Sequence, residues 1–279
     1  MPVPLRQLFA SILPSADKEI YKCRTGLYEA RIIDNTKEDT RKLFLDIQLA
    51  SGMKLSTGGL LFKYTLIGKL AHLTLALPKR SLFIGMGGGT EIRHFLLAHP
   101  HAQADIVEPD TKLPALAHQF FHFPLEDKRI SIHHTDGLSF LAKSKHKYDF
   151  IRLDAFDFGT FIPRHLLSLQ AASLMHSHLS SKGLLAANIV SPIEGEQSAF
   201  FRSAYKTFSL RFPYITLLCT APAEPEKVQN IALLASTTKP LTQQQLIKAA
   251  ASDAPLLELA NDCVWQKPIE TKDVPLLTA

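Results

Sequence analysis

The chain has 279 residues and a formal net charge of +5, with 46% hydrophobic and 20% charged residues. This composition supports a sizeable buried core and excludes a disordered chain or a repeat array. The lysines and arginines are scattered, so we expect no nucleic-acid partner. Charged residues interrupt the longest apolar stretch, residues 60–77, and the three cysteines form no CxxC pair. We therefore expect no membrane partner, no secretory leader and a cytoplasmic location.

The first part of the chain indicates a small antiparallel unit. Residues 4–13 are compatible with a short helix, and residues 26–34 alternate as a strand does. A polar turn at 35–40 separates the first expected strand from a second one at 41–49, and the two strands make a hairpin. A helical pattern follows at 60–77 and ends at Pro78. We therefore expect an N-terminal β-hairpin domain at 1–57 and a connecting helix at 58–79.

Short apolar runs then alternate with helical patterns, which is typical of βαβ units and a doubly wound α/β sheet. This domain is expected at 80–240, and it is followed by a C-terminal tail at 241–279 with a helix at 242–251 and irregular structure beyond. An antiparallel hairpin, 214–219 with 230–235, closes the sheet after a helix at 196–210. The other expected strands are 81–84, 104–107, 130–133, 148–153 and 184–189, and the helices between them are 91–98, 113–121, 137–142 and 163–179.

A glycine-rich loop follows the first strand of this series and directly precedes a helix. Glycine permits the positive φ angles of a sharp turn and lets the backbone approach a ligand closely. The position after the first strand favours a nucleotide-binding loop over a turn without a ligand. The candidate cofactor-binding residues are Gly85, Gly87, Gly88 and Gly89.

Carboxylates follow the next three strands, at the edge of the sheet where open α/β folds bind ligands. Glu108 lies about 20 residues beyond the glycines, where the dinucleotide fold places an acid on the ribose. Asp136, with Gly137 leaving room beside it, is suited equally to an adenine amino group and to capping the next helix. Asp154 and Asp157 are candidates for proton transfer or cation binding.

Together with residues 26–34, residues 43–48, Tyr64, Arg93 and the acidic-Pro segment at Asp273, these motifs resemble the polyamine aminopropyltransferase (spermidine synthase) family. The resemblance implies a Rossmann-like, S-adenosylmethionine-methyltransferase-like fold. It also implies a transferase of polyamine biosynthesis that moves an aminopropyl group from decarboxylated S-adenosylmethionine, the co-substrate, to a polyamine acceptor. The implied partners are this small-molecule amine acceptor and a possible second copy of the chain in a homodimer. By this resemblance, Asp154 would act as the base and Asp157 would help to bind the amine. Tyr64 would line the acceptor pocket, Glu108 would hold the ribose, and Asp136 the adenine.

Two features depart from the family pattern. The family has an aspartate at the position of Gly88, where it grips the amino group of the aminopropyl arm, and acids before the tyrosine that matches Tyr64. Residues 58–65 contain no acid. The alternatives are therefore an S-adenosylmethionine-dependent methyltransferase of unknown substrate and a non-catalytic nucleoside-binding protein. His118 and His122 have the spacing of a ligand pair, but no third ligand lies near them in sequence, so we expect no metal.

Overall fold

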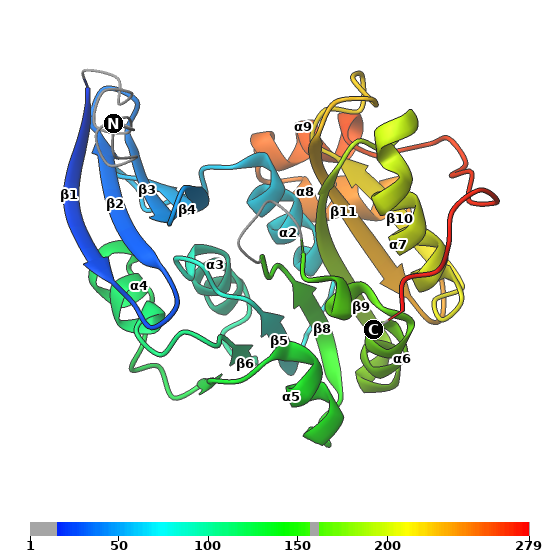
Figure 1. Cartoon of the computed structure of the whole chain (residues 1–279), viewed down its shortest axis with the longest axis horizontal. Coiled ribbons are helices and arrows are strands. Elements are labelled where there is room, and N and C mark those ends of the chain that lie inside the picture. The colour runs from blue at the N-terminus through cyan, green and yellow to red at the C-terminus, as the bar shows by residue number, and fades with distance from the viewer. Residues whose placement is uncertain (1–15, 157–161, 279) are drawn as a thin grey trace, which may run out of the picture.

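The computed structural model describes residues 16–156 and 162–278. In this part of the chain a four-stranded antiparallel sheet precedes a seven-stranded mixed sheet that is flanked by helices (Figure 1). The helix expected at residues 4–13 lies outside the described residues. Among the helices that are described, none has the length and hydrophobicity needed to cross a bilayer.

The N-terminal sheet contains the expected hairpin as its two central strands. Alternate residues of the second strand, such as Ala30 and Ile32, are buried, as the sequence pattern requires. The expected strand at 41–49 is wrong beyond Leu45, because the chain turns at Asp46, whose φ is 54°. Hydrogen bonds between Asp46 and the backbone of Glu29 hold this turn. The four strands, in sheet order, are β1 (Asp17–Arg24), β2 (Glu29–Asn35), β3 (Thr40–Leu45) and β4 (Gln48–Lys54).

The second sheet has the strand order β10-β11-β9-β8-β5-β6-β7. Strand β11 runs antiparallel to both β9 and β10, and the other neighbouring strands of this sheet are parallel to one another. Strand β5 lies between β6 and β8, so the direction of winding reverses beside it, and this is where such sheets bind ligands. The strands are β5 (Arg80–Ile84), β6 (Gln103–Val107), β7 (Ile130–His133), β8 (Tyr148–Leu153), β9 (Leu179–Ser191), β10 (Tyr214–Cys219) and β11 (Gln229–Ser236).

Helices cover both faces of this sheet, and the side chains of each strand alternate between two apolar clusters. In β5, Phe83 faces one cluster, whereas Leu82 and Ile84 face the other. The first cluster includes α2 (Lys63–Leu73), α3 (Thr90–Ala98), α4 (Leu113–Phe121), α8 (Gln243–Ala250) and α9 (Ala254–Asp262). The second includes α5 (Gly137–Lys143), η1 (Arg164–Leu167), α6 (Leu169–His178) and α7 (Ala199–Ser209), and η2 (Glu196–Ser198) precedes α7.

The tail contains a second helix, so the expectation of irregular structure after residue 251 is wrong. Asp253 caps α9 by accepting a hydrogen bond from the Leu256 N–H, and a proline occupies its first turn. Leu256 and Leu259 are buried in the same cluster as α2. Helix α2 itself is shorter at both ends than the expected 60–77. The division of the chain into domains stays a prediction.

Candidate functional site

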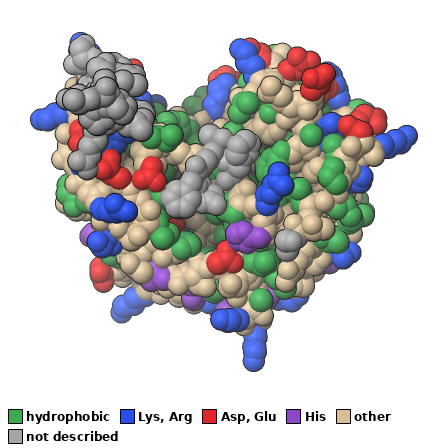
Figure 2. Space-filling view, in the orientation of Figure 1, with side chains coloured by type: hydrophobic (Ala, Val, Ile, Leu, Met, Phe, Trp, Pro, Cys, Tyr) green, Lys and Arg blue, Asp and Glu red, His purple; other side chains and the backbone are tan. Residues whose placement is uncertain are grey.

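A cavity of about 700 Å³ opens at the carboxyl ends of β5, β6 and β8. Strand β4 and the start of α2 contribute to its lining as well. Figure 2 shows the hollow between the N-terminal sheet and the rest of the molecule, with hydrophobic side chains along its walls. The cavity therefore lies at the sheet edge where the sequence places its ligand-binding residues.

The glycine loop turns under the cavity with backbone angles that other residues adopt only under strain. Gly85 has φ 89° and Gly87 has φ 49°, and both line the cavity. A Cβ on Gly85 would overlap the carbonyl oxygen of Asp154, which follows the neighbouring strand. Glycine at position 85 thus lets the ends of β5 and β8 approach each other directly below the site.

Gly88 and Gly89 serve packing in this structure and do not line the cavity. A Cβ on Gly88 would lie 2.9 Å from Ser51 Oγ, so strand β4 sits directly on the loop. A Cβ on Gly89 would lie 2.5 Å from the ring of Phe123. Their predicted contact with a cofactor stays a prediction.

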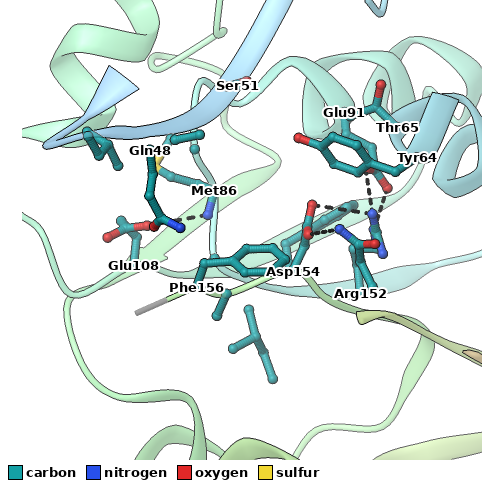
Figure 3. A pocket seen from close by; sticks show the side chains of 18 of the residues that line it. Gln48, Ser51, Tyr64, Thr65, Met86, Glu91, Glu108, Arg152, Asp154 and Phe156 are labelled. Atoms are coloured by element: carbon teal, nitrogen blue, oxygen red, sulfur yellow. Dashed lines mark hydrogen bonds and ion pairs between the residues drawn. The ribbon is translucent and has the colours of Figure 1, made fainter. Parts of the chain in front are cut away.

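Glu108 is buried at the end of β6 and is fixed by two backbone donors. Its Oε2 accepts a hydrogen bond from the Met86 N–H at 3.3 Å, and its Oε1 accepts one from the Asp110 N–H at 3.0 Å. Burial raises the pKa of Glu108 to about 7, against the effect of these hydrogen bonds. Each oxygen keeps a lone pair, so the carboxylate has acceptors left for the hydroxyls of a ligand. In Figure 3 the side chain of Gln48 lies beside it.

Asp136 follows β7 and caps α5. Its Oδ1 accepts a hydrogen bond from the Ser139 N–H at 3.0 Å, and its Oδ2 lies 2.7 Å from His165 Nε2. The structure therefore shows the capping role that the sequence left open, and it adds a hydrogen-bond partner from η1. Asp136 and Gly137 also line the cavity. The contact of Asp136 with adenine stays a prediction.

Asp154 follows β8 at the other end of the cavity. Its Oδ1 accepts a hydrogen bond from Asn188 Nδ2 at 2.8 Å, and its Oδ2 accepts one from Arg152 Nη2 at 3.3 Å. Asn188 is held in turn by Asn230, whose Nδ2 donates to Asn188 Oδ1 at 3.1 Å. The carboxylate is thus fixed by side chains from three strands and keeps lone pairs for a ligand.

A buried ion pair that the sequence analysis missed lies behind Asp154. Arg152 binds Glu91 in a bidentate manner, with Nε–Oε1 at 2.7 Å and Nη2–Oε2 at 3.1 Å (Figure 3). The two side chains are only 2% and 9% exposed. Burial raises the pKa of Glu91 to about 7, although Arg152 opposes this shift. The signal was present in the sequence, because an arginine stands in the otherwise apolar end of β8.

Helix α2 provides the space that this pair needs. A Cβ on Gly68 would overlap the carboxylate of Glu91, so a side chain at position 68 is incompatible with the pair. Glycine in the interior of a helix is unfavourable by roughly 1 kcal/mol relative to alanine. Packing against Glu91 is therefore the physical reason for glycine at this position.

Tyr64, the predicted substrate-binding residue, lies in the first turn of α2. Its ring stacks on Phe62 with the centroids 5.8 Å apart and lines the cavity beside Arg152 and Asp154 (Figure 3). Burial raises the pKa of Tyr64, and the nearby carboxylates of Asp154 and Glu91 raise it further. The hydroxyl is therefore neutral at physiological pH and can donate a hydrogen bond.

Two predictions remain, one for Asp157 and one for the pair His118 and His122. Asp157 lies outside the described residues, so its predicted role is untested. His118 Nδ1 lies 2.9 Å from the Phe123 carbonyl oxygen, and His122 follows the end of α4 with φ 57°. Within the described ranges, no group of three or more potential metal ligands occurs.

Comparison with known proteins identifies the family. The family model for the spermine/spermidine synthase domain matches residues 62–244. The chain belongs to this family. It is 32% identical over 177 residues to a polyamine aminopropyltransferase of Vibrio vulnificus, a match that covers 58% of each chain. It is 33% identical over 151 residues to that of Streptococcus uberis, covering 52% of each. The matches thus span little more than half the length of these curated relatives.

Solved structures confirm the predicted fold class. A probable spermidine synthase from Corynebacterium glutamicum superposes with a TM-score of 0.72 at 18% identity, covering 94% of this chain and 100% of that one. The spermidine synthase of Thermotoga maritima gives 0.64 at 18% identity, with 86% and 87% covered. Human methyltransferase-like protein 13, in complex with SAH, gives 0.53 at 21% identity, with 75% and 94% covered.

Proposed function

We propose that this protein transfers an aminopropyl group from decarboxylated S-adenosylmethionine to a small-molecule amine. The observation that carries the proposal is that one cavity joins the glycine loop and Glu108 to Asp154 and Tyr64. The glycine loop and Glu108 suit a nucleoside, whereas Asp154 and Tyr64 suit an amine that must be oriented and deprotonated. The polyamine aminopropyltransferases among its relatives support the same reaction.

In the proposed complex the nucleoside lies over the ends of β5, β6 and β7. Glu108 accepts hydrogen bonds from the ribose hydroxyls, and Gly85 and Gly87 let the loop backbone approach the ligand. Asp136 and Gly137 border the adenine. The sulfonium and its propyl arm then extend along the cavity toward Asp154, where the acceptor enters beside Tyr64.

The transfer step is a displacement at the carbon next to sulfur. The neutral amine nitrogen attacks this methylene carbon, the C–S bond breaks, and its electron pair neutralises the sulfonium to give methylthioadenosine. An alkylamine is protonated near pH 7, so its proton must leave before the attack. Asp154, anchored by Arg152 and Asn188, accepts that proton and holds the nitrogen in line.

One observation favours methyl transfer as a second candidate. The hydroxyl of Ser51 lies against Gly88, and no acidic side chain occupies that position. A neutral hydroxyl there does not repel the carboxylate of intact S-adenosylmethionine. A methyltransferase on the same site would release S-adenosylhomocysteine, and a non-catalytic nucleoside-binding protein would release neither product.

The nucleoside product distinguishes these candidates. We expect methylthioadenosine from decarboxylated S-adenosylmethionine and a panel of primary amines, and no S-adenosylhomocysteine from the intact compound. Asp154→Asn should lower kcat by about 100-fold or more, the usual range for losing a general base, while methylthioadenosine binding stays within about twofold on that same reasoning. Asp149→Asn is the matched control, because Asp149 lies on the same strand but outside the cavity. Normal turnover by Asp154→Asn would refute the assignment of the base.

A further inference from the structure

A short chain of hydrogen bonds connects Asp154 to a second amide in the cavity. Asn188 Nδ2 donates to Asp154 Oδ1 at 2.8 Å, and Asn230 Nδ2 donates to Asn188 Oδ1 at 3.1 Å. Asn188 is only 2% exposed, whereas Asn230 is partly exposed, and all three residues line the cavity. We call this chain the amide relay and define it by Asp154, Asn188 and Asn230.

The carboxylate determines the direction of both amides. Asp154 binds Arg152 through its other oxygen and, as an ionised group, only accepts hydrogen bonds. Asn188 must therefore turn its NH2 group toward Asp154 and its carbonyl toward Asn230. Asn230 must in turn present its own NH2 group to that carbonyl, because a carbonyl oxygen only accepts. The carbonyl oxygen of Asn230 is thus left at the free end of the relay.

The relay lies on the face of the sheet that α2 covers. Ala186 of β9 and Ala232 of β11 are buried in the same apolar cluster as α2. Asn188 and Asn230 are each two residues away along these strands, so their side chains lie on the same face. Tyr64, at the start of α2, lines the same cavity. Asn230 therefore borders the space between the sheet and the start of α2, where the acceptor enters in the proposed reaction.

The side-chain carbonyl oxygen of Asn230 has no hydrogen-bond partner among the described residues. The NH2 group is used by Asn188, and the backbone N–H and C=O pair with Thr220 at the end of β10. In this part of the chain the fully enclosed side-chain atoms without a partner lie on other residues, so the Asn230 oxygen is accessible. It is therefore open to an N–H donor from a ligand in place of water.

The two ends of the relay can be reached by one small molecule. Two hydrogen bonds and two amide groups separate the Asn230 oxygen from Asp154, so these acceptors lie at most on the order of 10 Å apart. An alkyl diamine can place one nitrogen beside Asp154 and extend the other toward Asn230. The second nitrogen is protonated near pH 7 and carries N–H donors that need acceptors once water is excluded.

We propose that Asn230 is an acceptor-binding residue whose side-chain carbonyl accepts a hydrogen bond from the second, non-reacting ammonium group of a diamine or polyamine. The proposal rests on the proposed aminopropyl transfer and names a residue that selects its acceptor. Asp154 orients the reacting nitrogen, and the amide relay holds the Asn230 oxygen at a fixed place relative to it. Every member of the relay belongs to the described part of the chain, so the proposal does not depend on Asp157.

The test compares putrescine with n-butylamine, which has the same carbon chain but lacks the second nitrogen. The wild-type protein should use putrescine with a kcat/KM about tenfold higher or more, the usual effect of a hydrogen bond to a charged group. Asn230→Leu should lower that ratio by about tenfold. Its kcat with saturating butylamine should stay within about twofold, because Asp154 keeps its bond to Asn188. A merely structural role of Asn230 would lower kcat/KM equally for both amines.

Two further variants control for effects on the fold. Asn230→Ala removes the same carbonyl without adding bulk, so it should lower the ratio even where leucine disturbs the strand. Asn261→Leu makes the same side-chain change at an exposed position outside the cavity and should leave the ratio unchanged. A ratio lowered as strongly by Asn261→Leu as by Asn230→Leu would contradict the proposal.

Binding measurements separate this proposal from the proposed function. Putrescine and butylamine are titrated by calorimetry into the wild type and Asn230→Leu, both saturated with methylthioadenosine. Weaker binding of putrescine alone in the variant, without transfer by the wild type, would support the role of Asn230 and refute the reaction. Transfer that favours butylamine, or a ratio unchanged in Asn230→Leu and Asn230→Ala, would overturn the role of Asn230 and leave the reaction standing. Absence of both binding and transfer would overturn both proposals.

Discussion

Replacing Arg152 with methionine should destabilise the fold strongly and in a pH-dependent way. The substitution leaves the carboxyl group of Glu91 buried without its partner, since the two side chains are only 2% and 9% exposed. Removing one partner of a buried ion pair costs about 3–5 kcal/mol. For a chain of this size that corresponds to a fall in Tm of roughly 6–20 °C.

Protonation of Glu91 limits this cost and determines its pH dependence. Burial already raises the pKa of Glu91 to about 7, from an ordinary value of 4.5, and loss of Arg152 raises it further. The folded variant then binds a proton that the unfolded chain releases above the ordinary glutamate pKa. Its stability therefore falls as pH rises, by up to about 1.4 kcal/mol per pH unit. We expect the destabilisation to be larger at pH 8 than at pH 6.

A double variant isolates the pair. Glu91→Met with Arg152→Met replaces both charges by apolar side chains and should recover most of the lost stability, because a buried pair can often be exchanged for apolar residues at little cost. The assay is urea or thermal unfolding of the two single variants and the double variant at pH 6 and pH 8. If Arg152→Met and the double variant were equally stable at pH 8, the two residues would not form the buried pair described here.

Three further predictions concern Gly68 and two titrating groups. Gly68→Ala should lower the unfolding free energy by about 1–3 kcal/mol, because its Cβ overlaps Glu91. In a Glu91→Ala/Arg152→Met background the same substitution should raise the unfolding free energy by up to about 1 kcal/mol. Urea unfolding measures both changes, and the same sign in both backgrounds would contradict this explanation. Methylthioadenosine should bind more weakly as pH falls through about 7, where Glu108 takes up a proton, and calorimetry should find the dependence reduced in Glu108→Gln. Burial lowers the pKa of His72 well below 6.5, so its contribution to stability is lost as pH falls below that value. The raised pKa values of the buried glutamates act in the opposite direction, so the check is the Tm at pH 7.5 minus the Tm at pH 5.5. This signed value should be lower, meaning less positive or more negative, in His72→Leu than in the wild type. An equal value would show that His72 titrates freely in the folded protein.

The elements of the large sheet were predictable because their signals are local. Apolar runs of four to six residues, separated by helical patterns and a glycine loop, specify the parallel strands from β5 to β8. The turn at Asp46 was not predictable in this way, because hydrogen bonds to Glu29 across the sheet hold its positive φ. Helix α9 was predictable in principle, since Asp253 and Pro255 form an ordinary helix start.

The residues of the candidate site differ in the same way, because some have local signals in the sequence and others depend on tertiary contacts. Glu108 and Asp154 follow from their positions at strand ends, and the structure places both in the cavity. The role of Asp136 could not be decided from sequence, because its partner His165 lies on a different element. The importance of Arg152 depends on Glu91, which α3 brings to it from far along the chain. Tertiary contacts of this kind leave only a weak trace in sequence, here a charged residue in an apolar strand.

The most direct test of the central claim is a crystal structure of the protein with decarboxylated S-adenosylmethionine. The account predicts that the ribose hydroxyls bind Glu108 and that the carbon to be attacked lies on the side of the cavity that holds Asp154 and Tyr64. A nucleoside bound elsewhere, or bound here with its propyl arm pointing away from Asp154, would contradict the account.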